Sequence, residues 1–145
     1  MLAFDFGTRR VGVAVGNTVT RVAHPLAVID EEASARRFAA IAALVDEWQP
    51  GILVVGIPVH ADGAPHEMTA RARRFARQLS GRHRLPVIEA DERHTTEQAQ
   101  SALDAAGRGG RRGRTERDAL AAQAILQGYF DEPGAGRVLG TAAGD

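Results

Sequence analysis

The spacing of apolar residues changes once along this chain of 145 residues, and that change constrains the fold more than any other feature. The first part holds three short segments of β-favouring residues, 2–6, 11–15 and 22–29, joined by short links. Beyond residue 30, helical spacing alternates with short apolar runs. Three strands with short links predict an antiparallel meander, and the alternation predicts βαβ crossovers onto the same sheet.

Helical spacing predicts the elements that follow the meander. The first helix is expected from Glu31 to Trp48, with Asp30 as its N-cap and Trp48 packed in the core. Later helices are expected near residues 68–79, 95–107 and 115–129, and strands at 52–55 and 86–90. The sequence therefore predicts an α/β fold with a mixed five-stranded sheet flanked by helices, as one domain over residues 1–132 with a flexible tail over 133–145.

Composition excludes several classes of protein. Hydrophobic residues make up 44% and charged residues 25%, as in an ordinary globular domain, and the chain has no cysteine for a disulfide or a thiolate metal site. All 18 basic residues are arginine, balanced by 18 acidic residues, so a P-loop lysine is excluded. No apolar run could span a membrane, and no basic segment precedes Asp5 as in a signal peptide, so the cytosol is the expected compartment.

Asp5 is the acid that most needs an explanation. Alternation along the first strand places Leu2, Phe4 and Phe6 on one face and Asp5 on the other. A carboxylate inside an apolar strand costs stability unless it is hydrogen-bonded, paired or bound to a metal. The alternative is that Asp5 caps the turn that begins at Gly7.

Further acids stand at two later positions. Asp91 and Glu92 close the last apolar strand, at the edge where open α/β sheets place their ligands, although a solvated acidic turn would also explain them. Asp118 shares a helical face with Ala122 and Ile125 and needs a partner, unless it only stabilises the start of the last helix. Acids from three segments would repel each other unless cations such as Mg²⁺ or Mn²⁺ held them, and two such ions suit in-line phosphoryl displacement.

Arginines surround these acids in the sequence. Residues 108–117 contain five arginines and one acid, and form either a solvated loop or a flexible phosphate grip beside Asp118. Arg9 and Arg10 follow the strand of Asp5, so a local positive rim is expected in spite of zero net charge. The second helix carries further arginines that we interpret as a solvated face: Arg71, Arg73, Arg74 and Arg77.

Four segments together resemble one family. They are residues 4–14 (FDFGTRRVGVA), 54–58 (VVGIP) with the Asp-Gly pair at 62–63, 91–96 (DERHTT) and 118–122 (DALAA). In this order and spacing they are similar to the YqgF family, whose members are regarded as pre-16S rRNA nucleases and as homologues of Holliday junction resolvases with a ribonuclease H-like fold. The resemblance covers residues 2–131.

The resemblance implies a two-metal endonuclease that acts on structured nucleic acid, either precursor 16S rRNA or branched DNA, with Mg²⁺ or Mn²⁺ as cofactor. It implies that Asp5, Glu92 and Asp118 bind metal, with Asp91 as the alternative to the longer Glu92. Related resolvases often carry a glutamate at the end of the fourth strand, which is absent from residues 55–58 here, so the fifth strand must supply the ligand. The residues expected at the substrate are Thr8, Arg9, Arg10, Arg93, Arg111, Arg112, Arg114 and Arg117.

Two other functions remain open at this stage. One is a non-catalytic RNA-binding factor of ribosome assembly that keeps the fold, with its affinity carried by residues 108–117. The other is an ATPase of the sugar-kinase or actin type, which also uses an Asp-x-Gly-Thr turn but needs two such domains. The histidines, His66 among them, lack the spacing of a zinc site. The sequence does not choose between a monomer and a homodimer.

Overall fold

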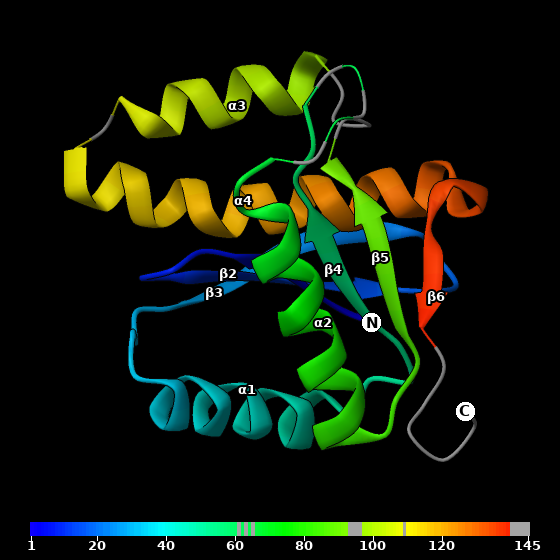
Figure 1. Ribbon diagram of the computed structural model, residues 1–145. Coiled ribbons are helices and arrows are strands. Elements are labelled where there is room, and N and C mark those ends of the chain that lie inside the picture. Colours follow the sequence, from blue (N-terminus) through cyan, green and yellow to red (C-terminus); the bar gives the residue numbers. More distant parts are fainter. Residues whose placement is uncertain (61, 63, 65, 93–96, 109, 140–145) are drawn as a thin grey trace.

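The protein is described from a computed structural model of the chain, which places residues 1–60, 62, 64, 66–92, 97–108 and 110–139 (Figure 1). No helix among these residues is long and apolar enough to cross a bilayer. In chain order the elements are β1 (Leu2–Phe6), β2 (Val11–Asn17), β3 (Val22–Ile29), α1 (Ser34–Trp48), β4 (Leu53–Ile57), α2 (Thr69–His83), β5 (Val87–Asp91), α3 (Glu97–Gly107), α4 (Gly110–Asp131), the 3-10 helix η2 (Pro133–Ala135) and β6 (Arg137–Leu139).

The strands form one mixed sheet in the order β3-β2-β1-β4-β5-β6. Strands β1, β2 and β3 are antiparallel neighbours, as the meander predicts, and β1, β4 and β5 run parallel through βαβ crossovers. The register places Asp5 of β1 opposite Gly12 of β2. The predicted α/β architecture is therefore confirmed, and the carboxyl ends of three central parallel strands meet at one edge.

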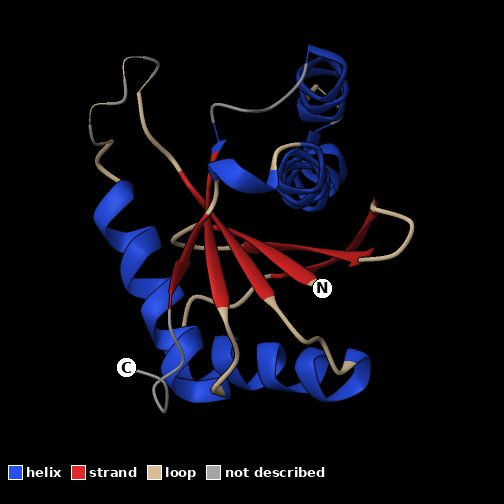
Figure 2. Cartoon of the chain, turned by 90° about the vertical axis from the view of Figure 1, so that its right-hand side faces the viewer, coloured by secondary structure: helices blue, strands red, loops and turns tan. Residues whose placement is uncertain are grey.

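The sheet separates two layers of helices (Figures 1 and 2). Helices α1 and α2 cover one face, where Phe4 packs with Phe75 in the larger apolar cluster. Helix α4 covers the other face, where Ala3, Val54 and Leu126 belong to the second cluster, and α3 packs against α4. Alternation along β1 puts Asp5 on the α4 face, away from Phe4, as expected.

The first helix ends at Trp48 as predicted, but its start and the burial of Trp48 differ from the prediction. It begins at Ser34 after Ala33, and no side chain caps it, because Asp30 lies outside the helix and faces Arg9 instead. Trp48 is 44% exposed rather than packed in the core. It is the last residue of α1, and the chain turns away after it through Gln49, which has a left-handed backbone conformation.

The last helix begins earlier than expected. Helix α4 starts at Gly110 and includes most of the segment that was predicted as a Gly/Arg loop before residue 115. Asp118 therefore lies in the middle of a helix of 22 residues and does not stabilise its start. Glycine is a poor helix former in isolation, but α4 packs along the sheet, and such packing outweighs local propensity.

A sixth strand extends the predicted five. Residues 137–139 pair antiparallel with β5, in the segment expected to be a flexible tail, and residues 140–145 lie outside the described part. Without β6, the edge of β5 would expose unpaired backbone groups. A segment of three residues carries too little pattern to be predicted as a strand from the sequence.

Candidate functional site

The acidic centre begins with Asp5 and Glu92. Asp5 lies near the carboxyl end of β1 and Glu92 directly follows β5, two strands away in the same parallel set. Their carboxyl groups are in hydrogen-bond contact with each other. Burial raises the pKa of Asp5 well above its usual value, and the negative charges of Glu92 and Asp118 raise it further. Burial also raises the pKa of Glu92.

Gly56 makes the contact between these two acids possible. It lies in β4, between β1 and β5, and pairs with Ala90 in β5. A Cβ atom on Gly56 would lie 2.8 Å from Oε1 of Glu92 and would also overlap Ile125 of α4. The missing side chain leaves room for Glu92 to lie across β4 toward Asp5. This explains how the fifth strand can take the place of an acid at the end of the fourth.

Asp118 is brought to the same centre by the close packing of α4 on β2. A Cβ atom on Gly12, the neighbour of Asp5 across the sheet, would overlap the backbone carbonyl oxygen of Asp118. The backbone of α4 therefore rests directly on β2 at this point. Asp118 lies close enough to Asp5 for its charge to raise the pKa of that residue. The predicted inward face of α4 is confirmed, because Ala122 and Ile125 are buried.

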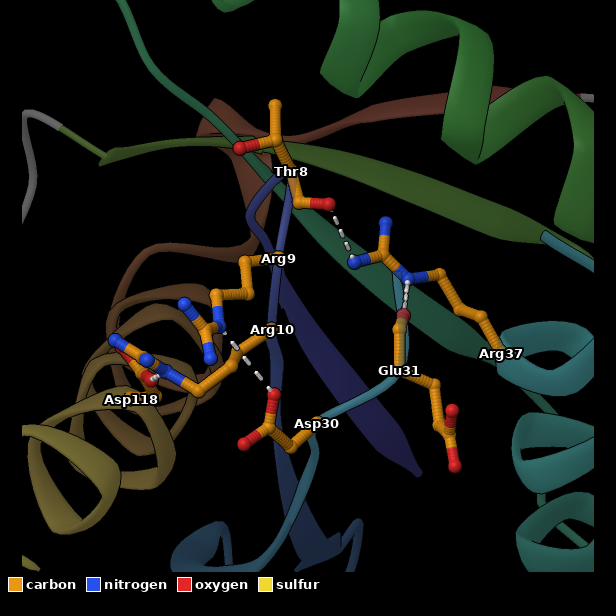
Figure 3. Close-up of polar contacts among 7 residues, drawn as sticks. All are labelled: Thr8, Arg9, Arg10, Asp30, Glu31, Arg37 and Asp118. Atoms are coloured by element: carbon orange, nitrogen blue, oxygen red, sulfur yellow. Dashed lines mark hydrogen bonds and ion pairs between the residues drawn. The ribbon is translucent and has the colours of Figure 1, made fainter. Parts of the chain in front are cut away.

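Arg10 is the partner that Asp118 needs. Its Nε donates a hydrogen bond of 2.6 Å to Oδ2 of Asp118, and the two side chains are 28% and 21% exposed (Figure 3). The hydrogen bond and the charge of Asp118 raise the pKa of Arg10. The sequence analysis expects Arg10 at a substrate phosphate. The structure places it on Asp118 instead, a pairing that local sequence could not reveal because 108 positions separate the residues.

The choice between Asp91 and Glu92 follows from strand alternation. Val87 belongs to the cluster on the α1 and α2 face, whereas Ile88 and Ala90 belong to the cluster under α4. Asp91 therefore falls on the α2 side of β5, where it lines a small hollow with Arg73. Glu92, one position on, is the acid that meets Asp5.

The turn between β1 and β2 carries two further candidates. Thr8 and Arg9 are both exposed, and Nε of Arg9 lies 3.8 Å from Oδ1 of Asp30 (Figure 3). Arg117, half-buried in α4, lies near enough to Asp5 for its positive charge to lower the pKa of that carboxyl. Residue Arg93 and the side chains of Arg111, Arg112 and Arg114 lie outside the described part of the chain.

Sequence reasoning missed Arg37 of α1. This arginine is buried, and its Nη2 and Nε donate hydrogen bonds of 2.9 Å to the carbonyl oxygens of Thr8 and Glu31 (Figure 3). It thereby ties the β1–β2 turn to the start of α1. An arginine directly before Phe38 on the apolar side of a helix was the available indication, since a cation there must find acceptors.

His66 lies near the acidic centre, although the spacing of the histidines in the sequence did not indicate a site there. It stands in the loop between β4 and α2, close enough to Glu92 for a positive charge on its ring to lower the pKa of that acid. Its Nδ1 accepts a hydrogen bond of 3.1 Å from the backbone N–H of Met68, which fixes the ring in this loop.

The centre offers carboxylate oxygens to a divalent cation. Among the described residues, no three acidic or histidine side chains are grouped closely enough to hold a metal ion as they stand, since Asp118 is turned to Arg10. Asp5 and Glu92 lie in hydrogen-bond contact, and a cation relieves the repulsion between acids in such contact. These two residues could hold Mg²⁺ or Mn²⁺, and Asp118 could join them by leaving Arg10.

Comparison with known proteins gives one consistent family. The model of the family described as "RuvX: Holliday junction resolvase" matches residues 1–132. A "Putative pre-16S rRNA nuclease" of Chromobacterium violaceum is 54% identical over 134 residues, which cover 92% of this chain and 98% of that protein. The protein of the same name from Nitrosomonas europaea is 55% identical over 131 residues, covering 90% of this chain and 88% of its own length.

The fold agrees with this assignment. The structure of Thermus thermophilus RuvC in complex with a Holliday junction substrate superposes with a TM-score of 0.56, covering 96% of this chain and 99% of that chain, at 18% identity. At such identity the similarity shows a shared fold, in which a mixed sheet is flanked by helices on both faces. With a family match over almost the whole described chain and relatives at more than half identity, the protein belongs to the RuvX family of Holliday junction resolvases.

Proposed function

We propose that the protein is a metal-dependent endonuclease that trims precursor 16S rRNA in the cytoplasm, with branched DNA as the alternative substrate. The observation that carries the proposal is the pair of half-buried carboxyls, Asp5 and Glu92, held in hydrogen-bond contact beside Asp118. Such a pair lowers the stability of the folded protein, because burial and mutual repulsion both oppose ionisation. A function for the pair would explain why the chain carries it. The name of these relatives, "Putative pre-16S rRNA nuclease", supports the choice of RNA.

The acidic residues fit a site for Mg²⁺ or Mn²⁺. Both ions prefer oxygen ligands, and the contact between the carboxyl groups of Asp5 and Glu92 marks a position where positive charge is favourable. When bound, the ions would supply an activated water and neutralise charge on the phosphate that is attacked. Asp5 and Glu92 would hold such an ion through their ionised carboxylates.

Arg10 has two roles in this proposal, one while it is bonded to Asp118 and one when that contact is broken. While it holds Asp118, it neutralises an acid that would otherwise raise the repulsion at Asp5. Were Asp118 to bind a divalent cation, the guanidinium of Arg10 would be free to form charge-assisted hydrogen bonds to phosphate oxygens. This exchange reconciles the contact seen in the structure with the role in phosphate binding that the sequence predicts.

The reaction follows from an in-line geometry. Water attacks the phosphorus atom, the bond from phosphorus to the 3′ oxygen breaks, and that oxygen takes up a proton. The products are then a 5′-phosphate and a 3′-hydroxyl. Arg9 and Arg117 add positive charge near the acids, which would attract the phosphate backbone of a substrate despite the neutral total charge.

The proposal is tested by cleavage of a precursor 16S rRNA fragment and of a four-way DNA junction, each with Mn²⁺ and with EDTA. Wild-type protein should cleave only with metal, and Asp5→Asn should lose cleavage while still binding the substrate. Asp46→Asn, which alters an exposed acid of α1, is the matched control and should cleave normally. Equal cleavage by Asp5→Asn would contradict the proposal, and binding without any cleavage by the wild type would favour the non-catalytic assembly factor.

A further inference from the structure

A pocket lies between α1 and α2, behind the β1–β2 turn. Its volume is about 390 Å³, within the range of about 300–1,000 Å³ that is usual for sites of small ligands. One wall is Phe6, the last residue of β1 and the neighbour of Asp5, although the two side chains point to opposite faces of the sheet. The pocket therefore lies on the other side of the strand that carries the acidic centre, at the same end of that strand.

The charge of the pocket is positive. Arg37, Arg71 and Arg74 line it, with Glu32 as its acid. Arg37 is buried, and its Nε and Nη2 already donate to backbone carbonyl oxygens. It therefore contributes positive charge to the pocket rather than free hydrogen-bond donors. Arg71 and Arg74 are exposed on α2 and form no ion pair with any residue that the structure describes. Two adjacent arginines free to donate are suited to a phosphate group.

The floor of the pocket is aromatic. The ring of Phe75 lies 4.9 Å from that of Phe6 and 5.9 Å from that of Phe38, measured between centroids. Phe6 remains half-buried, so part of its surface faces the pocket, and the guanidinium of Arg37 lies 5.4 Å from the centre of its ring. Aromatic rings and guanidinium planes are the surfaces on which unpaired nucleobases stack. Gln78 adds a polar side chain to the lining that could bond a base edge.

The pocket is joined to the acidic centre by the β1–β2 turn. Arg37 holds the carbonyl oxygen of Thr8 from the pocket side, and Arg10 at the end of the same turn holds Asp118 on the other side (Figure 3). The β1–β2 turn therefore contacts a residue of the pocket and also carries the partner of Asp118. The arginines of the pocket and of the turn would then line a single path for a strand of nucleic acid.

We propose that this pocket binds one nucleotide of the substrate strand, flanking the phosphate that is cleaved. Its base packs on the exposed part of the Phe6 ring, and its phosphate is held by Arg71 and Arg74. The inference rests on the proposed nuclease function and adds to it a requirement for an unpaired nucleotide near the cut. The same chemistry would also accept a free nucleoside monophosphate, and the test separates these two sources.

The test compares Arg71→Ala/Arg74→Ala with Arg36→Ala/Arg77→Ala, which removes two exposed arginines of α1 and α2 that do not line the pocket. Each is combined with Asp5→Asn, so that binding is measured without cleavage. Fluorescence anisotropy follows a single-stranded RNA oligonucleotide across salt concentrations, and calorimetry follows AMP, with inorganic phosphate as the comparison. Circular dichroism checks the fold of each variant.

The pocket variant should bind the oligonucleotide at least tenfold more weakly than the control. Loss of two phosphate contacts should also reduce the slope of log affinity against log salt by about 1.4, since each contact to a single strand contributes about 0.7. Equal weakening in both variants, or none in either, would overturn the inference. Pocket-dependent binding of AMP with no such dependence for the oligonucleotide would overturn the assignment to the substrate strand.

With Asp5 intact, the pocket variant should raise the KM for an RNA substrate that has an unpaired flanking nucleotide and leave kcat unchanged. A fully paired substrate should show no difference between the two variants. Failure of the nuclease proposal would appear as absence of cleavage by the wild type and would leave the binding result intact, so the two failures are distinguishable.

Discussion

Gly56→Ala is the substitution that tests most sharply how β4 accommodates Glu92. The new Cβ would lie 2.8 Å from Oε1 of Glu92, whereas ordinary contacts begin at 3.4 Å, so the carboxyl group must move by about 0.6 Å. The same Cβ also presses on Ile125 of α4. A misplacement of about 1 Å in a catalytic group can cost a factor of about one hundred. We therefore expect kcat to fall by between about tenfold and a hundredfold.

Gly16→Ala is the matched control for this substitution. Its Cβ would lie 2.7 Å from Cδ2 of Leu126 and 2.7 Å from Cε2 of Phe130, so it crowds the same interface between the sheet and α4 without touching an acid. Crowding of a packed core costs about 1–3 kcal/mol, and this cost should be similar in both variants. Their melting temperatures should therefore fall together, while only Gly56→Ala loses activity beyond the loss of folded protein.

The assay is single-turnover cleavage with saturating metal, at a temperature where both variants remain folded by circular dichroism. A rate constant for Gly56→Ala equal to that of the wild type would refute the reasoning, because the position of Glu92 would then not matter to the reaction. A fall in activity of Gly16→Ala as large as that of Gly56→Ala would also refute it, since the effect would then belong to the packing of α4.

Three further predictions concern the charges of the acidic centre. In EDTA, the unfolding free energy of the wild type should fall as the pH rises above the usual pKa of an aspartate. The reason is that the pKa of Asp5 is raised in the folded state, which therefore binds a proton that the unfolded state has lost. Melting curves recorded at several pH values should show a smaller fall for Asp5→Asn. Mg²⁺ or Mn²⁺ should raise the melting temperature of the wild type and have little effect on Asp5→Asn, as differential scanning fluorimetry would show. A double-mutant cycle of Arg10→Ala and Asp118→Ala should give a coupling energy of about 1.5–3 kcal/mol in EDTA. With saturating metal the coupling energy should be smaller, because Asp118 leaves Arg10. A coupling energy that metal does not change would contradict that exchange.

The main features of the fold follow from patterns that are local in the sequence. Alternation in β1 places Asp5 on the face opposite Phe4, and the helical face of Asp118 is set by Ala122 and Ile125. Both are consequences of a fixed period, 2 for a strand and 3.6 for a helix, so they can be counted without knowledge of the tertiary fold. The parallel pairing of β1, β4 and β5 then brings Asp5 and Glu92 to one edge of the sheet.

The features that the sequence did not predict depend on contacts between distant segments. The pairing of Arg10 with Asp118, and the space that Gly56 leaves for Glu92, arise only when α4 and β5 are placed on the sheet. Trp48 belongs to the apolar stripe of α1 by spacing, but its exposure depends on where the sheet ends beneath the helix. The arginines of α2 have helical spacing typical of a solvated face, and only the position of α1 makes two of them the wall of a pocket.

The central claim is that Asp5, Glu92 and Asp118 hold divalent metal in the active protein. Crystals grown with Mn²⁺ and measured at its absorption edge would test it directly. We predict an anomalous peak about 2.2 Å from carboxylate oxygens of Asp5 and Glu92, with Asp118 turned away from Arg10 to join them. A map without a peak at these residues, with the Asp118 carboxylate still on Arg10 at saturating Mn²⁺, would contradict the claim.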